Sequence, residues 1–458
     1  MRSITLYEHG VLRAAPDAGG WPEGGTPWER AVPQRWFDRL CRFDERRAEG
    51  RVFDWGYKRA KATQFVGVVQ LDGVSLEILP KVERVPGDDD EASCGTVRRN
   101  LLWFLSRAGE VPCRERDLAA LRTRRAPLLD ALTALFASRL WEELLRGVAR
   151  DYVSLEEDLR RLRGKLLVPR QVARNAVHRE RFACCFDEFS EDTPLNQVLR
   201  CAAEVLVRQT RLPTAQQTLG RCLEVLDGVT ALPPDRARVV AGRVLLGRQT
   251  ARFTELFAFA RMVLDAQSAE VIAGETSTFS LLFDMNALFE GLVTDVVSRV
   301  ARRHHPQWRV HPQGKGHGRH LYDGGEAPKR LLPLAPDALL AGPDGRFVVI
   351  DAKWKRLALG ARGKGPRRED LYQLHGYCTR YGADAVVLHP SGGEGTKATW
   401  HTCDEAGEAL KRVTFATIDL SRDFSLRDEV TKLEDAVSKL LTEVLPPAEA
   451  AFPTEAAG

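Results

Sequence analysis

Two acids and a lysine flank short apolar runs in "PDALLAGPDGRFVVIDAKWKR", residues 336–356. Asp337 comes directly before the first run, and Asp351 and Lys353 come directly after the run "FVVI". Charged side chains at the end of an apolar strand are unfavourable unless they are paired or used. Two carboxylates and an ammonium group suit metal-dependent hydrolysis of a phosphodiester. The segment therefore predicts a hydrolytic site.

The turn between the two apolar runs decides whether the two acids meet. The loop 343–345 (Pro-Asp-Gly) is typical of a type I turn followed by a glycine in the left-handed conformation. This loop places Asp337 opposite Asp351, and directly opposite residues share a face of a sheet. A two-residue loop would place Asp337 opposite Ile350, on the wrong face. Lys353, two residues after Asp351, falls on the same face as that acid, and Trp354 falls on the opposite face, where we expect a core residue.

Facing carboxylates repel each other, and one of them is driven towards protonation unless a cation intervenes. Mg²⁺ takes one or two carboxylates, keeps several waters and accepts phosphate oxygens, so we expect one or two Mg²⁺ ions at Asp337 and Asp351. The metal would polarise the phosphate and lower the pKa of a bound water. Lys353 would hold the attacking water or stabilise charge on the phosphate.

Two predicted helices carry further candidates. Glu290, in "ALFEGL", would reach in from the helix before the strands as another metal or water contact; the alternative is ordinary helix charge. Gln373, in "DLYQLHGY", lies on the helix after the lysine strand, where Asp370, Gln373 and Tyr377 share one face by their spacing. The alternative for Gln373 is a helix-surface amide.

Contacts to DNA would have to come from local basic patches, because the net charge of the whole chain is only +4. The basic segment 299–330 contains five of the ten histidines at spacings that match no zinc site, together with several glycines. With "GARGKGPRR" (360–368), it is interpreted as a loop that touches phosphates; the alternative is a solvated loop. The candidate DNA-binding residues are Arg319, Lys329, Arg330, Lys355 and Lys364.

The elements that position these residues divide the chain into four regions. Residues 1–96 are predicted to be a β-rich domain with a hairpin at Asp72-Gly73 and a linker. Residues 97–275 are predicted to be a helical middle region, in which one helix starts at Thr193-Pro194. Residues 276–445 read as one long helix from Leu281, followed by strand, strand, helix and strand around one sheet, which indicates an α/β domain. Residues 446–458 are an Ala/Glu/Pro-rich tail that we expect to be disordered. The predicted fold class is a multidomain α+β protein.

Composition sets the broad class. The 458 residues, 44% hydrophobic and 28% charged, suit about three globular domains. Nine cysteines without a CxxC pair indicate reduced thiols in a cytoplasm. There is no apolar run of about 18 residues and no signal-peptide pattern, so we expect no membrane span.

The same residues resemble a known nuclease family. "PD", then "DAK", then a helix with "YQL" look like the PD-(D/E)xK fold, a weak motif when it stands alone. Four further segments, in this order, are similar to the McrC family, the nuclease subunit of McrBC-type restriction directed at 5-methylcytosine: "VSLEILPKVE", "LRGKLL", "FDEFSEDTPLNQVL" and "DMNALFEGLV". The resemblance covers most of residues 50–390. It implies that Asp337, Asp351 and Lys353 are the catalytic trio, with Glu290 and Gln373 in support.

The resemblance also implies partners. McrC-like subunits work with a hexameric, McrB-like AAA+ GTPase that recognises modified DNA, and their N-terminal part docks into that ring. This chain contains no GxxxxGK[ST] motif, so the motor would be another protein. A break in double-stranded DNA needs two active sites, so we expect a second copy of the chain at the cut. Two alternatives stay open: a catalytically inactive adaptor that stimulates the motor, and a stand-alone nuclease of another defence or repair system.

Overall fold

The structure is a computed structural model of the chain. It describes residues 2–17, 20–48, 50–81, 91–113, 117, 126–267, 278–324, 330–357, 366–393 and 395–445. The predicted disordered tail, 446–458, lies outside these residues. Among the described helices, none is both long enough and apolar enough to span a membrane.

The N-terminal part contains two four-stranded sheets, as its β-rich sequence predicts. One sheet has the order β1 (Arg2–Tyr7), β7 (Val74–Leu79), β6 (Phe65–Leu71) and β11 (Phe279–Asp284). The other has the order β3 (Glu29–Pro33), β2 (Val11–Ala15), β5 (Arg59–Ala62) and β4 (Phe53–Gly56). The predicted hairpin at Asp72-Gly73 is confirmed, since both residues adopt positive φ between β6 and β7. Helix α1 (Gln34–Glu45) was not predicted.

Strand β11 corrects the sequence interpretation of one long helix beginning near Leu281. The strand pairs with β6 in antiparallel fashion, from Phe279↔Gln70 to Asp284↔Phe65, and helix α10 (Met285–His304) begins directly after it. The side chain of Asp284 accepts from the N–H of Asn286 at 2.7 Å, which caps the start of the helix. The N-terminal sheet thus includes a strand from the segment assigned by sequence to the nuclease domain.

Helices dominate the middle part. They are α2 (Glu91–Arg107), α4 (Leu128–Leu145), α6 (Pro194–Gln209), α7 (Pro213–Val225), α8 (Pro234–Ala241), the 3₁₀ turn η1 (Ala251–Phe253) and α9 (Thr254–Asp265). The predicted start of α6 is confirmed, because Thr193 Oγ1 accepts from the N–H of Asn196 at 3.3 Å and Pro194 occupies the first helical position. Both features are typical of a helix N-terminus.

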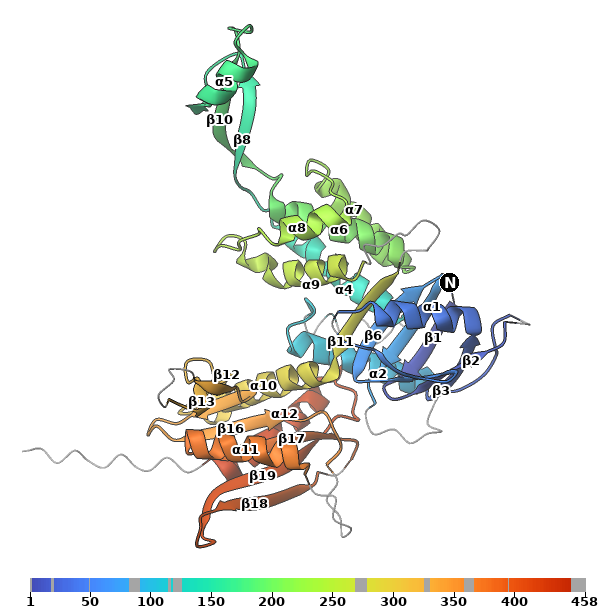
Figure 1. Cartoon of the computed structure of the whole chain (residues 1–458), viewed down its shortest axis with the longest axis vertical. Coiled ribbons are helices and arrows are strands. Elements are labelled where there is room, and N and C mark those ends of the chain that lie inside the picture. Colours follow the sequence, from blue (N-terminus) through green and yellow to red (C-terminus); the bar gives the residue numbers. More distant parts are fainter. Residues whose placement is uncertain are drawn as a thin grey trace, which may run out of the picture.

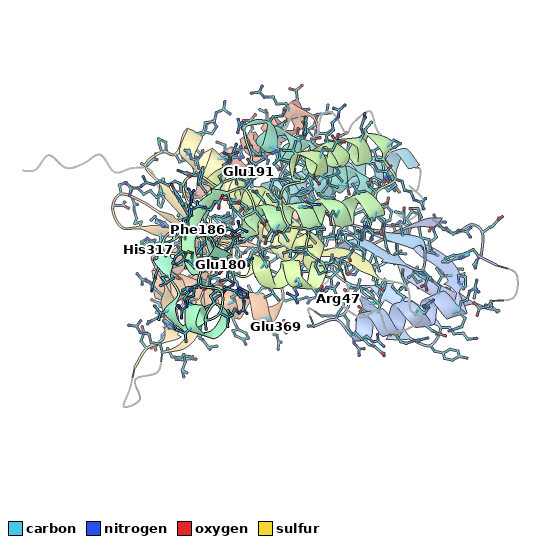
Figure 2. All side chains as sticks on the ribbon, turned by 90° about the horizontal axis from the view of Figure 1, so that it is seen from above. Arg47, Glu180, Phe186, Glu191, His317 and Glu369 are labelled. Carbon is cyan, nitrogen blue, oxygen red and sulfur yellow. The ribbon has the colours of Figure 1, made fainter. Side chains whose placement is uncertain are left out.

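The prediction of a wholly helical middle region is wrong for residues 151–190. These residues form an arm of β8 (Asp151–Leu159), β9 (Lys165–Leu166), α5 (Val168–Arg174) and β10 (Phe182–Ser190), which projects from the helices in Figure 1. Figure 2 labels Glu180 and Phe186 on this arm and Glu191 at its base. Most side chains of β8 are exposed on both faces, so its sequence lacks the apolar alternation that marks a half-buried strand.

The C-terminal part is a six-stranded mixed sheet covered on both faces. Its order is β12 (Arg309–Pro312), β15 (Ala338–Ala341), β16 (Phe347–Ala352), β17 (Asp384–Ser391), β19 (Ala409–Asp419) and β18 (Lys397–Cys403). Val349 and Val387 pack with helix α11 (Arg368–Tyr381) on one face. Val348 and Ile350 belong to the main core with α10 and α12 (Arg427–Val444) on the other. A separate ribbon pairs β13 (Arg319–Tyr322) with β14 (Leu331–Leu334).

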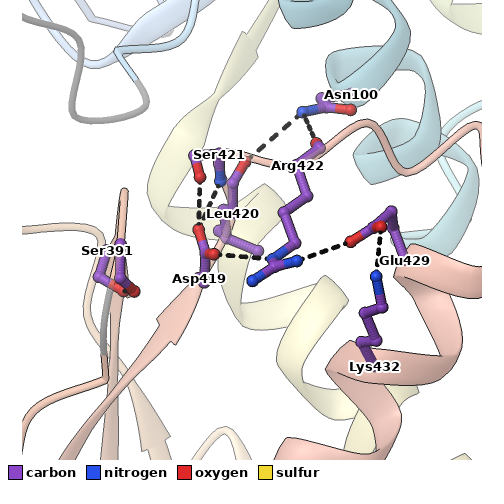
Figure 3. Close-up of polar contacts among 9 residues, drawn as sticks. Asn100, Ser391, Asp419, Leu420, Ser421, Arg422, Glu429 and Lys432 are labelled. Atoms are coloured by element: carbon purple, nitrogen blue, oxygen red, sulfur yellow. Dashed lines mark hydrogen bonds and ion pairs between the residues drawn. The ribbon is translucent and has the colours of Figure 1, made fainter.

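Helix α2 holds the loop that follows β19. The side chain of Asn100 donates to the carbonyl of Arg422 at 2.6 Å (Figure 3). It also accepts from the N–H of Phe424 at 3.0 Å. Phe424 also stacks on Trp103 of α2, with ring centroids 4.6 Å apart. The C-terminal sheet is therefore attached directly to the middle part, close to the start of α12.

Candidate functional site

The hairpin β15–β16 has the register that its turn predicts. The strands pair from Ala338↔Ile350 to Ala341↔Phe347, and the N–H of Gly342 donates to the carbonyl of Arg346 at 2.8 Å. Gly345 has φ +77, the left-handed conformation expected at this position. One further step along the ladder brings Asp337 opposite Asp351.

The backbone and side chain of Asp337 are held from three directions. Its Oδ2 accepts a hydrogen bond from the N–H of Ala352 at 2.6 Å, which ties it to the end of β16. Its carbonyl accepts from the N–H of Gln313 at 2.9 Å and from Thr294 Oγ1, on α10, at 3.3 Å. Burial, followed by the charge of Asp351, raises the pKa of Asp337 to about 7.

Asp351 is almost fully buried, with 1% of its surface exposed. Lys353 Nζ donates to its Oδ1 at 3.2 Å and lies 3.0 Å from its Oδ2. Within the described part of the chain, Oδ2 has no hydrogen-bond partner of acceptable geometry. Burial raises the pKa of Asp351, although the neighbouring ammonium group opposes that shift. Among these residues, Oδ2 therefore has an ion pair but no hydrogen bond, and such an oxygen is suited to a further ligand.

Lys353 joins the acids to helix α11. Its Nζ donates to Gln373 Oε1 at 3.3 Å, and Gln373 Nε2 donates to the hydroxyl of Tyr377 at 2.9 Å. That hydroxyl donates to the carbonyl of Ala335 at 3.0 Å, just before Asp337. Burial acts to lower the pKa of Lys353, but the charge of Asp351 outweighs it and the pKa is raised. The lysine is therefore protonated at neutral pH.

Glu290 approaches the same group from α10. It is half-buried, and burial raises its pKa, with the charges of Lys353 and Asp351 acting on it in opposite directions. The charge of Glu290 in turn raises the pKa of Asp337. The fold thus brings all five residues predicted for catalysis into one neighbourhood, although they come from two strand ends and two helices.

Comparison with known proteins assigns the chain to a family. The family model for the McrBC 5-methylcytosine restriction system component matches residues 60–389, a range that contains all five residues. The chain belongs to this family. No curated protein matches it.

Two solved assemblies from Thermococcus gammatolerans contain chains similar to this member of the McrBC family. One is a refined half-complex from a tetradecameric assembly of McrB AAA+ hexamers with bound McrC: 22% identity, TM-score 0.64, with 96% of this chain and 100% of that chain covered. The other is the McrBC complex: 26% identity, TM-score 0.47, with 65% of this chain and 88% of that chain covered. The first likeness shows a shared fold over almost the whole chain.

The carboxylates of this McrBC-family chain fit Mg²⁺ as a pair. Asp351 offers a buried oxygen without a hydrogen bond, and the mutual charge of Asp337 and Asp351 favours a cation between them. Two carboxylates are a sufficient protein contribution for Mg²⁺, which keeps several of its waters. In the described residues, no group of three or more His, Cys, Asp or Glu side chains is arranged to hold a metal ion, so Glu290 as a third ligand stays a prediction.

The predicted DNA-binding residues are more dispersed. Arg319 lies over the rings of Tyr381 and Phe347, at 5.2 and 5.8 Å from their centroids, and donates to the carbonyl of Arg380. Lys355 forms an ion pair with Asp370 of α11. The side chain of Arg330 is 72% exposed, 3.8 Å from Asp323. Lys329 and Lys364 lie outside the described residues.

The histidine-rich segment forms no metal group within the described residues. His311 and His317 make an edge-on ring contact at 4.5 Å, and His317 continues to Phe347 at 5.2 Å. Figure 2 shows His317 on the opposite side of the view from Arg47 of the N-terminal part. These histidines therefore join an aromatic cluster at the edge of the C-terminal sheet.

Sequence reasoning missed one residue at the margin of the site. Trp354 was interpreted as a core residue on the opposite face from Lys353, and it does pack against the core. Its indole N–H, however, donates to the carboxylate of Glu8, 346 positions earlier. No local pattern near Glu8 indicates such a contact, because the signal exists only in the folded chain.

Proposed function

We propose that this chain is a Mg²⁺-dependent DNA endonuclease subunit with a PD-(D/E)xK-type site. The observation that supports this most strongly is the pair Asp337 and Asp351, facing each other at the end of a hairpin with Lys353 bound to Asp351. A buried pair of acids with raised pKa values and a lysine beside them is typical of a functional site rather than of a structural contact.

Each side chain of the site has its own chemical role in this proposal. Asp337 and Asp351 hold one or two Mg²⁺ ions, which, when bound, polarise the scissile phosphate and lower the pKa of a water. Lys353 orients the attacking water or stabilises the charge that develops on the phosphate. Gln373 keeps the ammonium group in place through the hydrogen bond at 3.3 Å. Glu290 supplies a further contact to metal or water.

The proposed partner is a McrB-like AAA+ GTPase hexamer. The solved half-complex from Thermococcus gammatolerans contains McrB AAA+ hexamers with bound McrC, and this chain shares a fold with a chain of that assembly. The partner would recognise double-stranded DNA carrying a modified base such as 5-methylcytosine, and the N-terminal part of this chain would dock the motor. Two copies of this chain would meet to cut both strands in the cytoplasm, as part of defence against foreign DNA.

Cleavage of methylated and unmethylated plasmid tests this function. The purified chain is assayed with Mg²⁺, with and without the cognate AAA+ protein and GTP, beside the variant Asp351→Ala. We expect cutting only in the complete mixture with modified DNA, and none with Asp351→Ala.

The two alternatives give different results in the same assay. Cutting without partner or nucleotide would indicate a stand-alone nuclease. Stimulation of the partner's GTPase without cutting in any mixture would indicate an inactive adaptor, and would contradict the roles given to Asp337, Asp351 and Lys353.

A further inference from the structure

The residue after Lys353 is bound to the N-terminal part of the molecule. The indole N–H of Trp354 lies 3.1 Å from Oε1 and 2.9 Å from Oε2 of Glu8, which follows strand β1. The two residues are 346 positions apart. The contact thus joins one indole donor to both oxygens of a single carboxyl group.

Glu8 is a fixed acceptor. Only 1% of its surface is exposed, its own N–H donates to the carbonyl of Leu79 at 2.8 Å, and Oε2 also accepts from the N–H of Lys81 at 3.3 Å. Leu79 is the last residue of β7 and Lys81 follows shortly after it, so the carboxylate is attached to the N-terminal sheet. A buried carboxylate is held firmly when hydrogen bonds of this kind satisfy it.

Trp354 in turn contacts both sides of the candidate site. Its ring packs on Phe289, with centroids 5.4 Å apart, and Phe289 directly precedes Glu290 on α10. The two residues beside Trp354 in the chain are held by backbone hydrogen bonds. The N–H of Lys353 donates to the carbonyl of Leu388 at 2.9 Å, and the N–H of Lys355 donates to the carbonyl of Lys353 at 2.7 Å. The Glu8 contact therefore gives the segment a second attachment, in addition to its backbone bond to β17.

The first turn of α10 is tied to the same sheet. The N–H of Met285 donates to the carbonyl of Gln64, directly before β6, at 3.0 Å. The segments that carry Lys353 and Glu290 are thus both bonded to the N-terminal sheet, one through a side chain and one through the backbone.

We propose that Glu8 is a positioning residue for the nuclease site, acting through Trp354 on Lys353. The proposal rests on the proposed function and adds to it a route by which the N-terminal part sets the geometry of the site. Without the Glu8 contact, segment 353–355 loses its one side-chain hydrogen bond to Glu8 and the N-terminal sheet, and the ammonium group shifts relative to Asp351. A displacement of about 1 Å in a catalytic group can slow a reaction by roughly a hundredfold.

The test compares Glu8→Ala, Glu8→Gln and Trp354→Phe in the complete complex with the cognate AAA+ protein, GTP, Mg²⁺ and modified plasmid. We expect Glu8→Ala and Trp354→Phe to lower kcat by about tenfold to about a hundredfold while KM for DNA stays within about twofold. Glu8→Gln keeps an oxygen that accepts from the indole, so it should retain most of the activity. The double variant Glu8→Ala/Trp354→Phe should be no slower than the slower single variant, because both remove one interaction.

A matched control exists in the N-terminal part. Asp44, which is fully buried, accepts from the indole N–H of Trp55 at 2.7 Å, far along the chain from the nuclease site. Trp55→Phe removes the same kind of bond, and the ratio of its cleavage rate to the partner's GTPase rate should equal that of the wild type. Hydrogen exchange gives a readout without catalysis: the amides of 353–356 should exchange faster in Glu8→Ala than in the wild type.

The outcomes separate this proposal from the proposed function. Unchanged kcat in both Glu8→Ala and Trp354→Phe, with Asp351→Ala inactive, would overturn the positioning role alone. Equal losses in Glu8→Gln and Glu8→Ala would also overturn it, as would an additive double variant. A wild-type protein that cuts in no mixture would overturn the proposed function, and the positioning role with it.

Discussion

Two buried carboxylates, one in each large sheet, have opposite surroundings. Glu77 of β7 is 2% exposed and accepts from Arg98 at 2.9 and 2.8 Å, from the N–H of Leu128 at 2.8 Å and from Thr5 at 3.3 Å. Asp351 of β16 is 1% exposed, has a lysine on one side and an acid opposite, and keeps an oxygen without a hydrogen bond. Burial is therefore shared by both, but the hydrogen bonding differs, and a second acid faces Asp351 alone of the two.

The difference indicates which carboxylate stabilises the fold and which is available for chemistry. A satisfied buried ion pair is strongly destabilising to break, because its partner is left charged and unpaired. An unsatisfied acid beside a second acid is unfavourable for folding and is retained where function requires it. Changes at the two positions should therefore affect different measurements.

The largest effect is expected for Asp351→Asn. The substitution keeps the size of the side chain but removes a metal-binding charge, so cleavage should fall by roughly a thousandfold or more. The melting temperature without metal should fall less than in Glu77→Ala, because the removed repulsion with Asp337 offsets the lost pairing with Lys353. Plasmid cleavage rates and thermal melting measure the two quantities. A large drop in melting temperature with cleavage preserved would show that Asp351 stabilises the fold and does not take part in the reaction.

The converse change is Glu77→Ala, which removes the carboxylate paired with the partly buried guanidinium of Arg98. We expect the free energy of unfolding to fall by about 3–5 kcal/mol, measured by denaturant or thermal melting. At low temperature, where the protein stays folded, cleavage per folded molecule should match the wild type. Glu45 lies at an exposed position on α1. The variant Glu45→Ala is therefore a control that should leave the free energy of unfolding almost unchanged, as is usual for surface substitutions.

The pH dependence of stability sharpens the same contrast. Folding raises the pKa of Asp337 from 3.8 to about 7, so it stabilises the folded state while it is protonated, and this contribution is lost as the pH rises through about 7. This contribution to the melting temperature without metal should therefore fall between about pH 4 and about pH 7 and change little above that. Asp337→Asn should reduce that fall. An equal fall in the wild type and in Asp337→Asn would show that Asp337 is ionised throughout.

Mg²⁺ should act in the opposite direction on the same protein. A cation that binds only the folded state raises its stability, and it binds ionised carboxylates best. At about pH 8, millimolar Mg²⁺ should raise the melting temperature of the wild type but not that of Asp337→Asn or Asp351→Asn. A rise of equal size in all three proteins would indicate binding elsewhere.

The smallest effect is expected for Gln373→Ala. It removes one hydrogen bond to Lys353. A hydrogen bond of this kind contributes about 1 kcal/mol, so cleavage should slow by about twofold to about tenfold. Tyr372→Ala is the control, because Tyr372 is 75% exposed on the same helix. Equal cleavage rates for the two variants would indicate that Gln373 is a helix-surface amide without a part in cleavage.

Local patterns predicted the site hairpin well. The Pro-Asp-Gly loop fixes the register of β15 and β16, and helix α11 follows with Gln373 and Tyr377 on the face that its spacing predicts. These features depend on residues close together in sequence, where turn chemistry and periodicity act directly. The chemical roles of Asp337, Asp351 and Lys353 stay predictions.

Features that depend on distant segments could not be predicted. Strand β11 was merged with α10 because "FSLLFD" and the helix after it are both apolar, and only pairing with β6 distinguishes them. The arm strands β8 and β10 pair with each other outside the main core, and no side chain of β8 is buried, so β8 carries no clear apolar face. The contact between Glu8 and Trp354 has no local signal at all.

Strand β11 limits how this molecule can be divided into modules. The strand is the edge of the N-terminal sheet, and α10, which carries Glu290, begins at the next residue. A nuclease fragment cut out at residue 276 would take the edge strand with it and leave β6 with a bare edge, which favours aggregation. A fragment starting at Met285 would leave the strand behind but free the end of α10. Engineered chimaeras, and recombination between relatives, would therefore have to exchange the two halves together.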